Sequence, residues 1–261
     1  MKFDINNPSF LQGASRVGGA GEYISFVDST GNPQIYQLSA IGDVTIQSIY
    51  NGEPISQTVT NPTDTGVQIQ SDANTEVVLY GKITKLDCDS GPGFFTDFTN
   101  IDVSHAKSLT SLNCGANQLT SLDVSANAAL TNLNCGANQL TSLDISANAA
   151  LTYLICGGNQ LTSLDVSANT ALTSLRCNDN QLTSLDVSAN TALTILVCGK
   201  NQTLLTIDGI GVNEDVANSI ANAITDATSV DGTVTLRQGD EFNQTIIDAA
   251  MEKGWDVQYY Q

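Results

Sequence analysis

Apolar residues return in the same order every 21 residues between positions 109 and 201. Each copy divides into two halves of similar design, L-T-x-L-x-C-x-x-N-Q and then L-T-S-L-D-[VI]-S-A-N, as in 130–139 and 140–148. In both halves two apolar residues flank a single position, so they share one face of a short strand and the residue between them faces the other way. The pattern predicts a repeat solenoid with two short parallel β-strands in each 21-residue coil, because such units bury their apolar side only by stacking on their neighbours.

Asparagine follows both predicted strands at a constant place. Its side chain bonds neighbouring backbone groups and tolerates turn conformations, so stacked asparagines can satisfy buried amides where the chain turns inward. The two sets are Asn117, Asn138, Asn159, Asn180 and Asn201 after the first strand, and Asn127, Asn148, Asn169 and Asn190 after the second. We therefore expect two asparagine ladders.

One cysteine recurs in every copy, and a sixth precedes the regular series. The positions are Cys88, Cys114, Cys135, Cys156, Cys177 and Cys198. Parallel strands in register lie about 4.8 Å apart, so the sulfurs should stand side by side in a core ladder, an orientation unsuited to disulfides. The chain has no C-x-x-C pair of the kind that binds zinc. We interpret the cysteines as small apolar residues that fill the core.

The series L-x-x-L-x-C-x-x-N-x-L resembles the leucine-rich repeat signature. The doubled 21-residue form is similar to a bacterial and phage subclass whose two half-units are nearly alike. The resemblance extends over about half of the chain, from Val77 to Asp208, and implies a leucine-rich repeat solenoid of about six coils. The first coil departs from it, since GPGFFTDFTN follows shortly after Cys88 and adds five residues that we expect to protrude as a loop.

Both flanks of the repeats change character. Alternating runs between turn-rich stretches predict strands before the repeats, where they would cover the open end of the solenoid. After the repeats, 213–225 and 241–253 have apolar residues at helical spacing, and 233–237 and 255–260 are predicted strands. The ending AAMEKGWDVQYY is similar to the segment that closes many phage and bacterial repeat proteins, and Trp255 should shield the last coil. The expected parts are a β-rich attachment segment (1–43), an N-terminal β cap (44–80), the solenoid (81–208) and an α/β C-terminal cap (209–261).

The chain carries 27 acidic and nine basic side chains, a formal net charge of −18. Nucleic acid and anionic membrane surfaces repel a polyanion, and no segment approaches the apolar length of a membrane span, so we expect neither nucleic-acid binding nor membrane insertion. The second predicted strand adds an outward acidic row, which comprises Asp123, Asp144, Asp165 and Asp186. We expect these carboxylates to be solvated and bonded by the following Ser and Asn; a row of Ca²⁺ ions is the alternative.

His105 is the only histidine, and it falls at a predicted coil corner. A Ser-His-Asp or Cys-His catalytic set therefore has no repeated histidine to use. The sequence also lacks the P-loop, dinucleotide-binding, HExxH and EF-hand motifs. We expect a protein that is not an enzyme and needs no cofactor or metal.

The outward positions of the first strand differ from copy to copy, whereas the second half is almost constant. Exposed apolar and aromatic residues around a cation are typical of interface cores. The candidate recognition face comprises Asn132, Asn134, Tyr153, Ile155, Ser174, Arg176, Ile195 and Val197. The turn that follows varies as well, from Gly115-Ala116 to Asn178-Asp179. The alternative interpretation is that drift after repeat duplication produced these differences.

A repeat scaffold without catalytic groups indicates recognition or assembly. The lack of a secretory signal after Met1 and the unpaired cysteines favour a phage virion protein, made in the host cytoplasm, over a bacterial cell-surface or secreted adhesin. In that hypothesis residues 1–43 dock on other virion proteins, and the solenoid binds a host-surface protein or glycan. A homo-oligomer is compatible with the same sequence.

Overall fold

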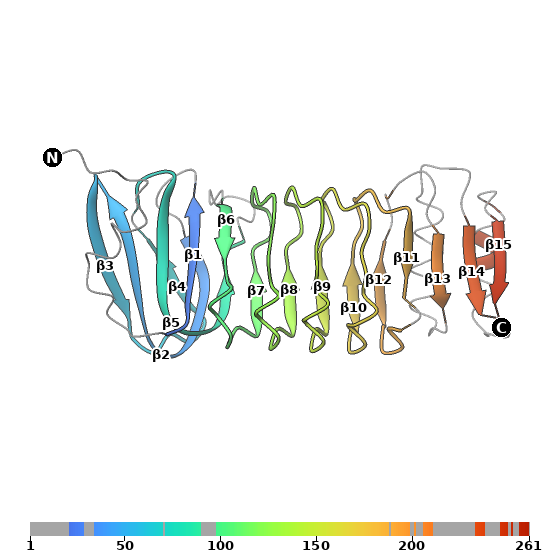
Figure 1. Cartoon of the computed structure of the whole chain (residues 1–261), viewed down its shortest axis with the longest axis horizontal. Coiled ribbons are helices and arrows are strands. Elements are labelled where there is room, and N and C mark those ends of the chain that lie inside the picture. Colours follow the sequence, from blue (N-terminus) through green and yellow to red (C-terminus); the bar gives the residue numbers. More distant parts are fainter. Residues whose placement is uncertain are drawn as a thin grey trace.

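The chain folds into an antiparallel sheet at its N-terminal end, a row of stacked coils, and a small parallel sheet at its C-terminal end (Figure 1). The computed structural model describes residues 21–28, 34–69, 71–89, 98–187, 189–198, 201, 206–210, 233–237, 246–249, 252 and 256–260. The expected solenoid with parallel strands is confirmed. Of the expected loop at 91–100, residues 91–97 lie outside the described residues, and 98–100 instead belong to a strand in which Phe98 is buried. The helix expected at 213–225 and Trp255 also lie outside the described residues.

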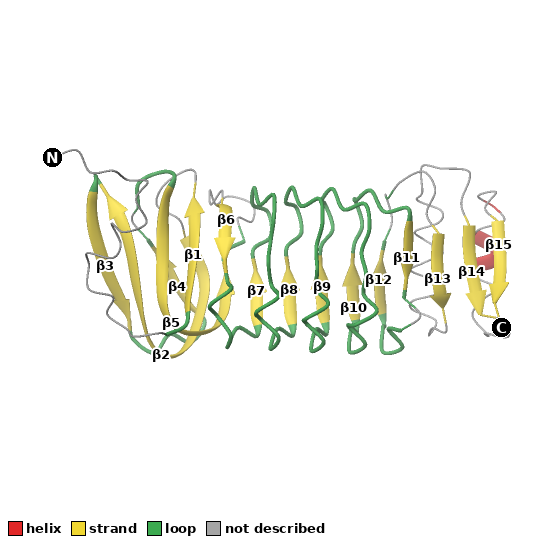
Figure 2. Cartoon of the chain, in the orientation of Figure 1, coloured by secondary structure: helices red, strands yellow, loops and turns green. Residues whose placement is uncertain are grey.

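The N-terminal sheet is built from long strands, in contrast to the coils (Figure 2). Its strands are β1 (Tyr23–Asp28), β2 (Gln34–Tyr50), β3 (Glu53–Val59), β4 (Thr65–Gln68), β5 (Thr75–Asp87) and β6 (Phe98–Asp102). β1 lies antiparallel between β5 and β6, and β2 pairs with β3, β4 and β5. β2 runs across the expected boundary between residues 43 and 44, so the described parts of the first two segments share one sheet.

β5 joins this sheet to the solenoid. Its first half pairs antiparallel with β1, and its last residues, Lys85 to Asp87, pair parallel with the first coil strand. Side chains seal the same junction: the Ser108 N–H and Oγ donate to the Glu22 carboxylate at 2.9 and 2.8 Å, and the Tyr23 and His105 rings stack with centroids 4.2 Å apart. His105, expected at an exposed coil corner, is exposed but carries this contact. The N-terminal sheet therefore caps the solenoid by continuing its hydrogen bonding.

Each coil contributes one three-residue strand to a parallel sheet. The strands are β7 (Ser111–Asn113), β8 (Asn132–Asn134), β9 (Tyr153–Ile155), β10 (Ser174–Arg176) and β12 (Ile195–Val197). The register pairs equivalent residues, so each central leucine meets the next central leucine. The leucines and the cysteine after each strand are buried, which puts the core inside the coil.

The prediction of two strands per coil holds at the two ends of the solenoid and is wrong in its middle. The strands β6, β11 (Ser184–Asp186) and β13 (Thr206–Ile210) lie in second halves, whereas 119–124, 140–145 and 161–166 form no strand. The other second halves use their backbone groups locally: the Ser125 N–H donates to Asp123 Oδ1 at 2.9 Å, and the Asn127 N–H to the Val124 carbonyl at 3.0 Å. The Leu130 N–H then donates to the Asn127 carbonyl at 3.0 Å. Successive tight turns thus replace a second ladder.

The six cysteines are free and fully buried, as the core interpretation predicted. Burial raises the pKa of each thiol, to about 12 for Cys135 and Cys198, because the thiolate would lose its hydration. The Cys88 and Cys114 thiols donate to carbonyls of the next coil at 3.3 and 3.5 Å. Neutral, hydrogen-bonded thiols are inert packing groups.

The C-terminal end is a parallel sheet in the order β11-β13-β14-β15. The added strands are β13 (Thr206–Ile210), β14 (Thr233–Arg237) and β15 (Asp256–Tyr260), and the last two lie where strands were expected. Residues 246–249, within the expected second helix, are helical, and Ile246 and Ala249 are buried against the core. Among the described residues no helix has both the length and the apolar character to cross a membrane.

Candidate recognition face

The strand pairing brings the predicted face together in two rows. The outer residues of β8, β9, β10 and β12 are paired in register, so they lie in adjacent positions on one side of the sheet. The first row is Asn132, Tyr153, Ser174 and Ile195, and the second is Asn134, Ile155, Arg176 and Val197. All eight residues therefore lie on one side of the sheet.

Their exposure is uneven. Ile195 is 41% exposed, and apart from Ile41 no other large apolar residue in the described part of the chain is classed as exposed. Ser174, in contrast, is only 4% exposed, and its Oγ finds no hydrogen-bond partner among the described residues. Its register neighbours are the larger Tyr153 and Ile195, which explains why a small side chain between them is covered. The expectation of an accessible Ser174 is thus wrong.

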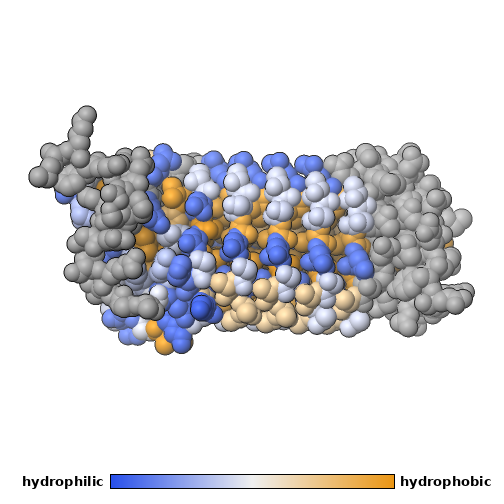
Figure 3. Space-filling view, viewed as in Figure 1, coloured by the Kyte–Doolittle hydropathy of each residue, from blue (hydrophilic) through white to orange (hydrophobic). Residues whose placement is uncertain are grey.

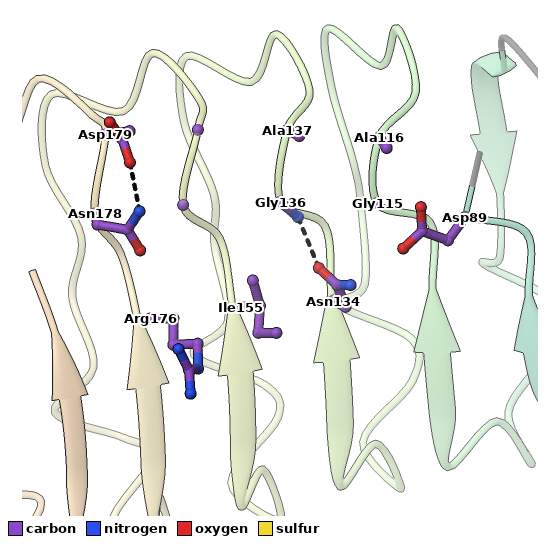
Figure 4. A pocket seen from close by; sticks show the side chains of 12 residues that line it. Asp89, Gly115, Ala116, Asn134, Gly136, Ala137, Ile155, Arg176, Asn178 and Asp179 are labelled. Carbon is purple, nitrogen blue, oxygen red and sulfur yellow. Dashed lines mark hydrogen bonds between the residues drawn. The ribbon is translucent and has the colours of Figure 1, made fainter. Parts of the chain in front are cut away.

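A groove of about 400 Å³ lies beyond the ends of these strands, at the turns (Figure 4). It is lined by Asp89, Gly115, Ala116, Asn134, Gly136, Ala137, Ile155, Gly157, Gly158, Arg176, Asn178 and Asp179. Three predicted residues, Asn134, Ile155 and Arg176, form part of its wall. The variable turns were recognised in the sequence, but Asp89 was missed because only the five regular copies were compared, and Asp89 stands in the irregular first coil at the place of Gly115 and Gly136.

Close stacking of the turns determines which residues form the groove. A Cβ on Gly157 would lie 2.9 Å from both the carbonyl oxygen and Oδ1 of Asn178 in the next coil, too close for any side chain. The next residue, Gly158, has φ +67°, and Asp179 at the equivalent place has φ +53°, in the left-handed region. The Gly158 N–H donates to the Asn178 carbonyl at 2.9 Å, so neighbouring turns are also tied to each other. The groove floor is mostly backbone for this reason.

Charge is confined to the ends of the groove. Asp89 lies at one end, where burial raises the pKa of its carboxyl; a hydrogen bond with the Asn113 side chain opposes this rise and Asp87 adds to it. Arg176 lies toward the other end, half-buried, and forms no ion pair within the described parts of the chain. Asp179 is also at that end, where the Asn178 amide donates to its carboxylate. The lining between the two ends is uncharged.

The acidic row lies in the second half-coils, away from these strands. Asp123, Asp144 and Asp165 are exposed, and the backbone N–H two residues further on donates to each Oδ1 at 2.9 Å. Hydrogen bonds from the serine two residues further on lower the pKa of all three carboxyls, and the bond from the serine side chain lowers it more than the bond from the serine backbone N–H. Asp186 is exposed in β11. No three metal-ligating side chains converge anywhere among the described residues, and a Ca²⁺ row stays an untested alternative.

Comparisons with known proteins add a likeness but no family. No family model matches the chain, and neither does any curated protein. Among solved structures, the functional domain of InlJ from Listeria monocytogenes, described as including a cysteine ladder, matches 69% of this chain at 23% identity with a TM-score of 0.28. The chain spans about half of that structure, since 55% of it is covered. A TM-score this low carries no argument, so the assignment as a leucine-rich-repeat-like β-solenoid rests on the strand pairing of this chain.

Proposed function

We propose that the chain is a non-catalytic recognition protein whose strand face, the eight outward residues of β8, β9, β10 and β12, binds another molecule. One observation carries the proposal. The coil is repeated with the same buried leucines, cysteines and asparagines, while the outward strand residues change from coil to coil and lie in register on one surface. Tyr153, Ile195 and Arg176 are of the types that dominate interface energetics.

The second half-coils supply the contrast. Their exposed Thr, Ser and Asp residues repeat almost unchanged, and the viewed face of the solenoid shows apolar and hydrophilic bands that repeat regularly along it (Figure 3). A surface whose residues repeat is suited to keeping the coil soluble, whereas specific recognition requires residues that differ along the surface. The variation therefore favours the strand face as the binding surface.

The proposed setting is a phage virion, in which residues 1–43 attach to other virion proteins and the solenoid faces a host protein or glycan. The alternative setting is a bacterial cell surface or secretion. Mass spectrometry of purified particles and of washed cell envelopes from the source tests both. Finding the chain in envelopes and never in particles would favour the alternative.

The binding surface is tested with a pair of double variants. Tyr153→Ala with Arg176→Ala alters the strand face, and Thr162→Ala with Asp165→Ala alters the second half of a neighbouring coil. Both are screened with the unaltered protein on one array of purified glycans and synthetic peptides. We expect the first variant to weaken every bound ligand about tenfold or more and the second to weaken none. If both variants retained all binding, repeat drift would explain the variation.

A further inference from the structure

The position two residues before each groove turn changes its chemistry along the solenoid. In the first three coils this residue offers a side-chain oxygen to the backbone. Asp87 Oδ1 accepts a hydrogen bond from the Asp89 N–H at 3.3 Å. Asn113 Oδ1 accepts one from the Gly115 N–H, also at 3.3 Å. Asn134 Oδ1 then accepts the Gly136 N–H at 3.0 Å, a bond drawn in Figure 4. The next two coils have Ile155 and Arg176 at this position, and neither side chain can accept a hydrogen bond.

Two backbone donors lose their acceptor as a result. The N–H groups of Gly157 and Asn178 have no hydrogen-bond acceptor within the described chain. Their direction follows from the equivalent turns, because the side chain of Asn134 reaches the Gly136 N–H from the outward face. The Gly157 and Asn178 N–H groups therefore point toward the groove. A backbone N–H without a partner is a strong site for an incoming acceptor.

The change at position 176 also adds a cation to the lining of the same groove. Arg176 itself occupies the acceptor position of its coil, lines the groove with Gly157 and Asn178, and forms no ion pair to any described residue. The residue after Gly157 is left-handed Gly158, whose own N–H is bonded to the Asn178 carbonyl at 2.9 Å, so the Gly157 N–H is the donor that this turn leaves for an incoming acceptor. A guanidinium and backbone N–H groups that line one groove can each donate to a carboxylate, which accepts several hydrogen bonds at once.

We propose that this end of the groove, formed by Arg176 and the N–H groups of Gly157 and Asn178, binds the carboxylate of an acidic sugar on an otherwise neutral glycan. The net charge of −18 and the nearby Asp179 disfavour a phosphate or a polyanionic peptide, which would bring more negative charge. The uncharged remainder of the groove, with amides at Asn134 and Asn178, suits sugar hydroxyls. The inference rests on the proposed function and names its ligand class.

The test replaces the changed residues by the asparagine of earlier coils. Ile155→Asn gives the Gly157 N–H an acceptor, and Arg176→Asn does the same for the Asn178 N–H while it removes the cation. The probes are sialyllactose, its methyl ester and lactose, measured by calorimetry, with one short neutral peptide carrying a free or an amidated C-terminus. We expect binding of sialyllactose alone, weakened about tenfold or more by Arg176→Asn and about threefold or more by Ile155→Asn. Asn113→Ile is the matched control: it frees the Gly115 N–H two coils away from Gly157, lies outside the proposed face and the groove lining, and should leave the affinity unchanged.

Three outcomes overturn this inference without touching the proposed function. Equal binding of sialyllactose and its methyl ester would show that the carboxylate is not recognised. Binding of the free-terminus peptide instead of sialyllactose would show that the ligand is a protein and not a sugar. Loss of affinity in Tyr153→Ala with full retention in both asparagine variants would likewise keep the strand face and reject the carboxylate site. Circular dichroism of every variant, at the temperature of the titration, ensures that each result refers to folded protein.

Discussion

The two halves of each coil have nearly the same apolar pattern but fold differently. The first half forms a strand whose backbone bonds the coils on both sides, whereas in the middle coils the second half forms tight turns, as in the bond from the Asn169 N–H to the Val166 carbonyl. The difference lies in where the backbone hydrogen bonds go. In the second half the Asp-x-Ser segment captures a backbone N–H locally, as in the 2.9 Å bond from the Ser146 N–H to Asp144 Oδ1.

The asparagines of the two halves differ in the same way. Asn159, in the first half, accepts the Leu140 N–H and donates to the Cys135 and Cys156 carbonyls, all at 3.0 Å. Asn169, in the second half, donates to two carbonyls, but its Oδ1 is buried without a partner among the described residues. The strand half is thus held by backbone and buried side chains, which leaves its outward residues free to vary.

The largest expected effect is alkaline unfolding through the cysteine ladder. Folding raises the thiol pKa values above 9, to about 12 for Cys135 and Cys198, so the folded chain keeps protons that the unfolded chain releases. Stability is therefore full below pH 9 and falls as the pH rises toward 12, by up to about 1.4 kcal/mol per pH unit for each thiol. Urea unfolding followed at pH 8, 9, 10 and 11 measures the slope.

Cys156→Ala sharpens this test, because it removes one thiol from the middle of the ladder. The variant should be less stable at pH 8, where it leaves a small cavity, but should lose stability less steeply above pH 9. A slope equal to that of the unaltered protein would mean that the ladder does not control alkaline unfolding. Thiol reagents should label none of the six cysteines before unfolding, since all are fully buried.

The second effect compares the two asparagine ladders directly. Asn159→Ala leaves the buried Leu140 N–H and several carbonyls without a hydrogen-bond partner, and should lower the free energy of unfolding by about 3–5 kcal/mol. Asn169→Ala removes two bonds together with an oxygen that has no partner, and should cost about 1–2 kcal/mol. Urea denaturation of both variants gives the difference. Equal losses would contradict the view that the first half carries the stability of the coil.

Sequence reasoning succeeded where a residue faces the core and failed where a neighbouring coil or a local bond decides. The inward leucines and cysteines could be predicted because their period alone fixes their direction. The second strand could not, since an apolar pair has the same spacing whether its backbone bonds a neighbour or its own turn. The burial of Ser174 depends on Tyr153 and Ile195 beside it, and the groove depends on turns that stack only once the register is set.

The smallest effect should come from the acidic row, although it stacks four like charges. Asp144→Asn keeps an oxygen for the Ser146 N–H. It also removes a negative charge whose repulsion partly opposes the lowering of the pKa of Asp123 and Asp165. These side chains are exposed, so water and salt screen the gain, and the melting temperature should move by no more than about 2 °C. The same melting curves in millimolar calcium and in chelator should coincide. If calcium raised the melting temperature and Asp144→Asn abolished this increase, the row would be a cation site. The constant half of the coil would then have a binding role as well.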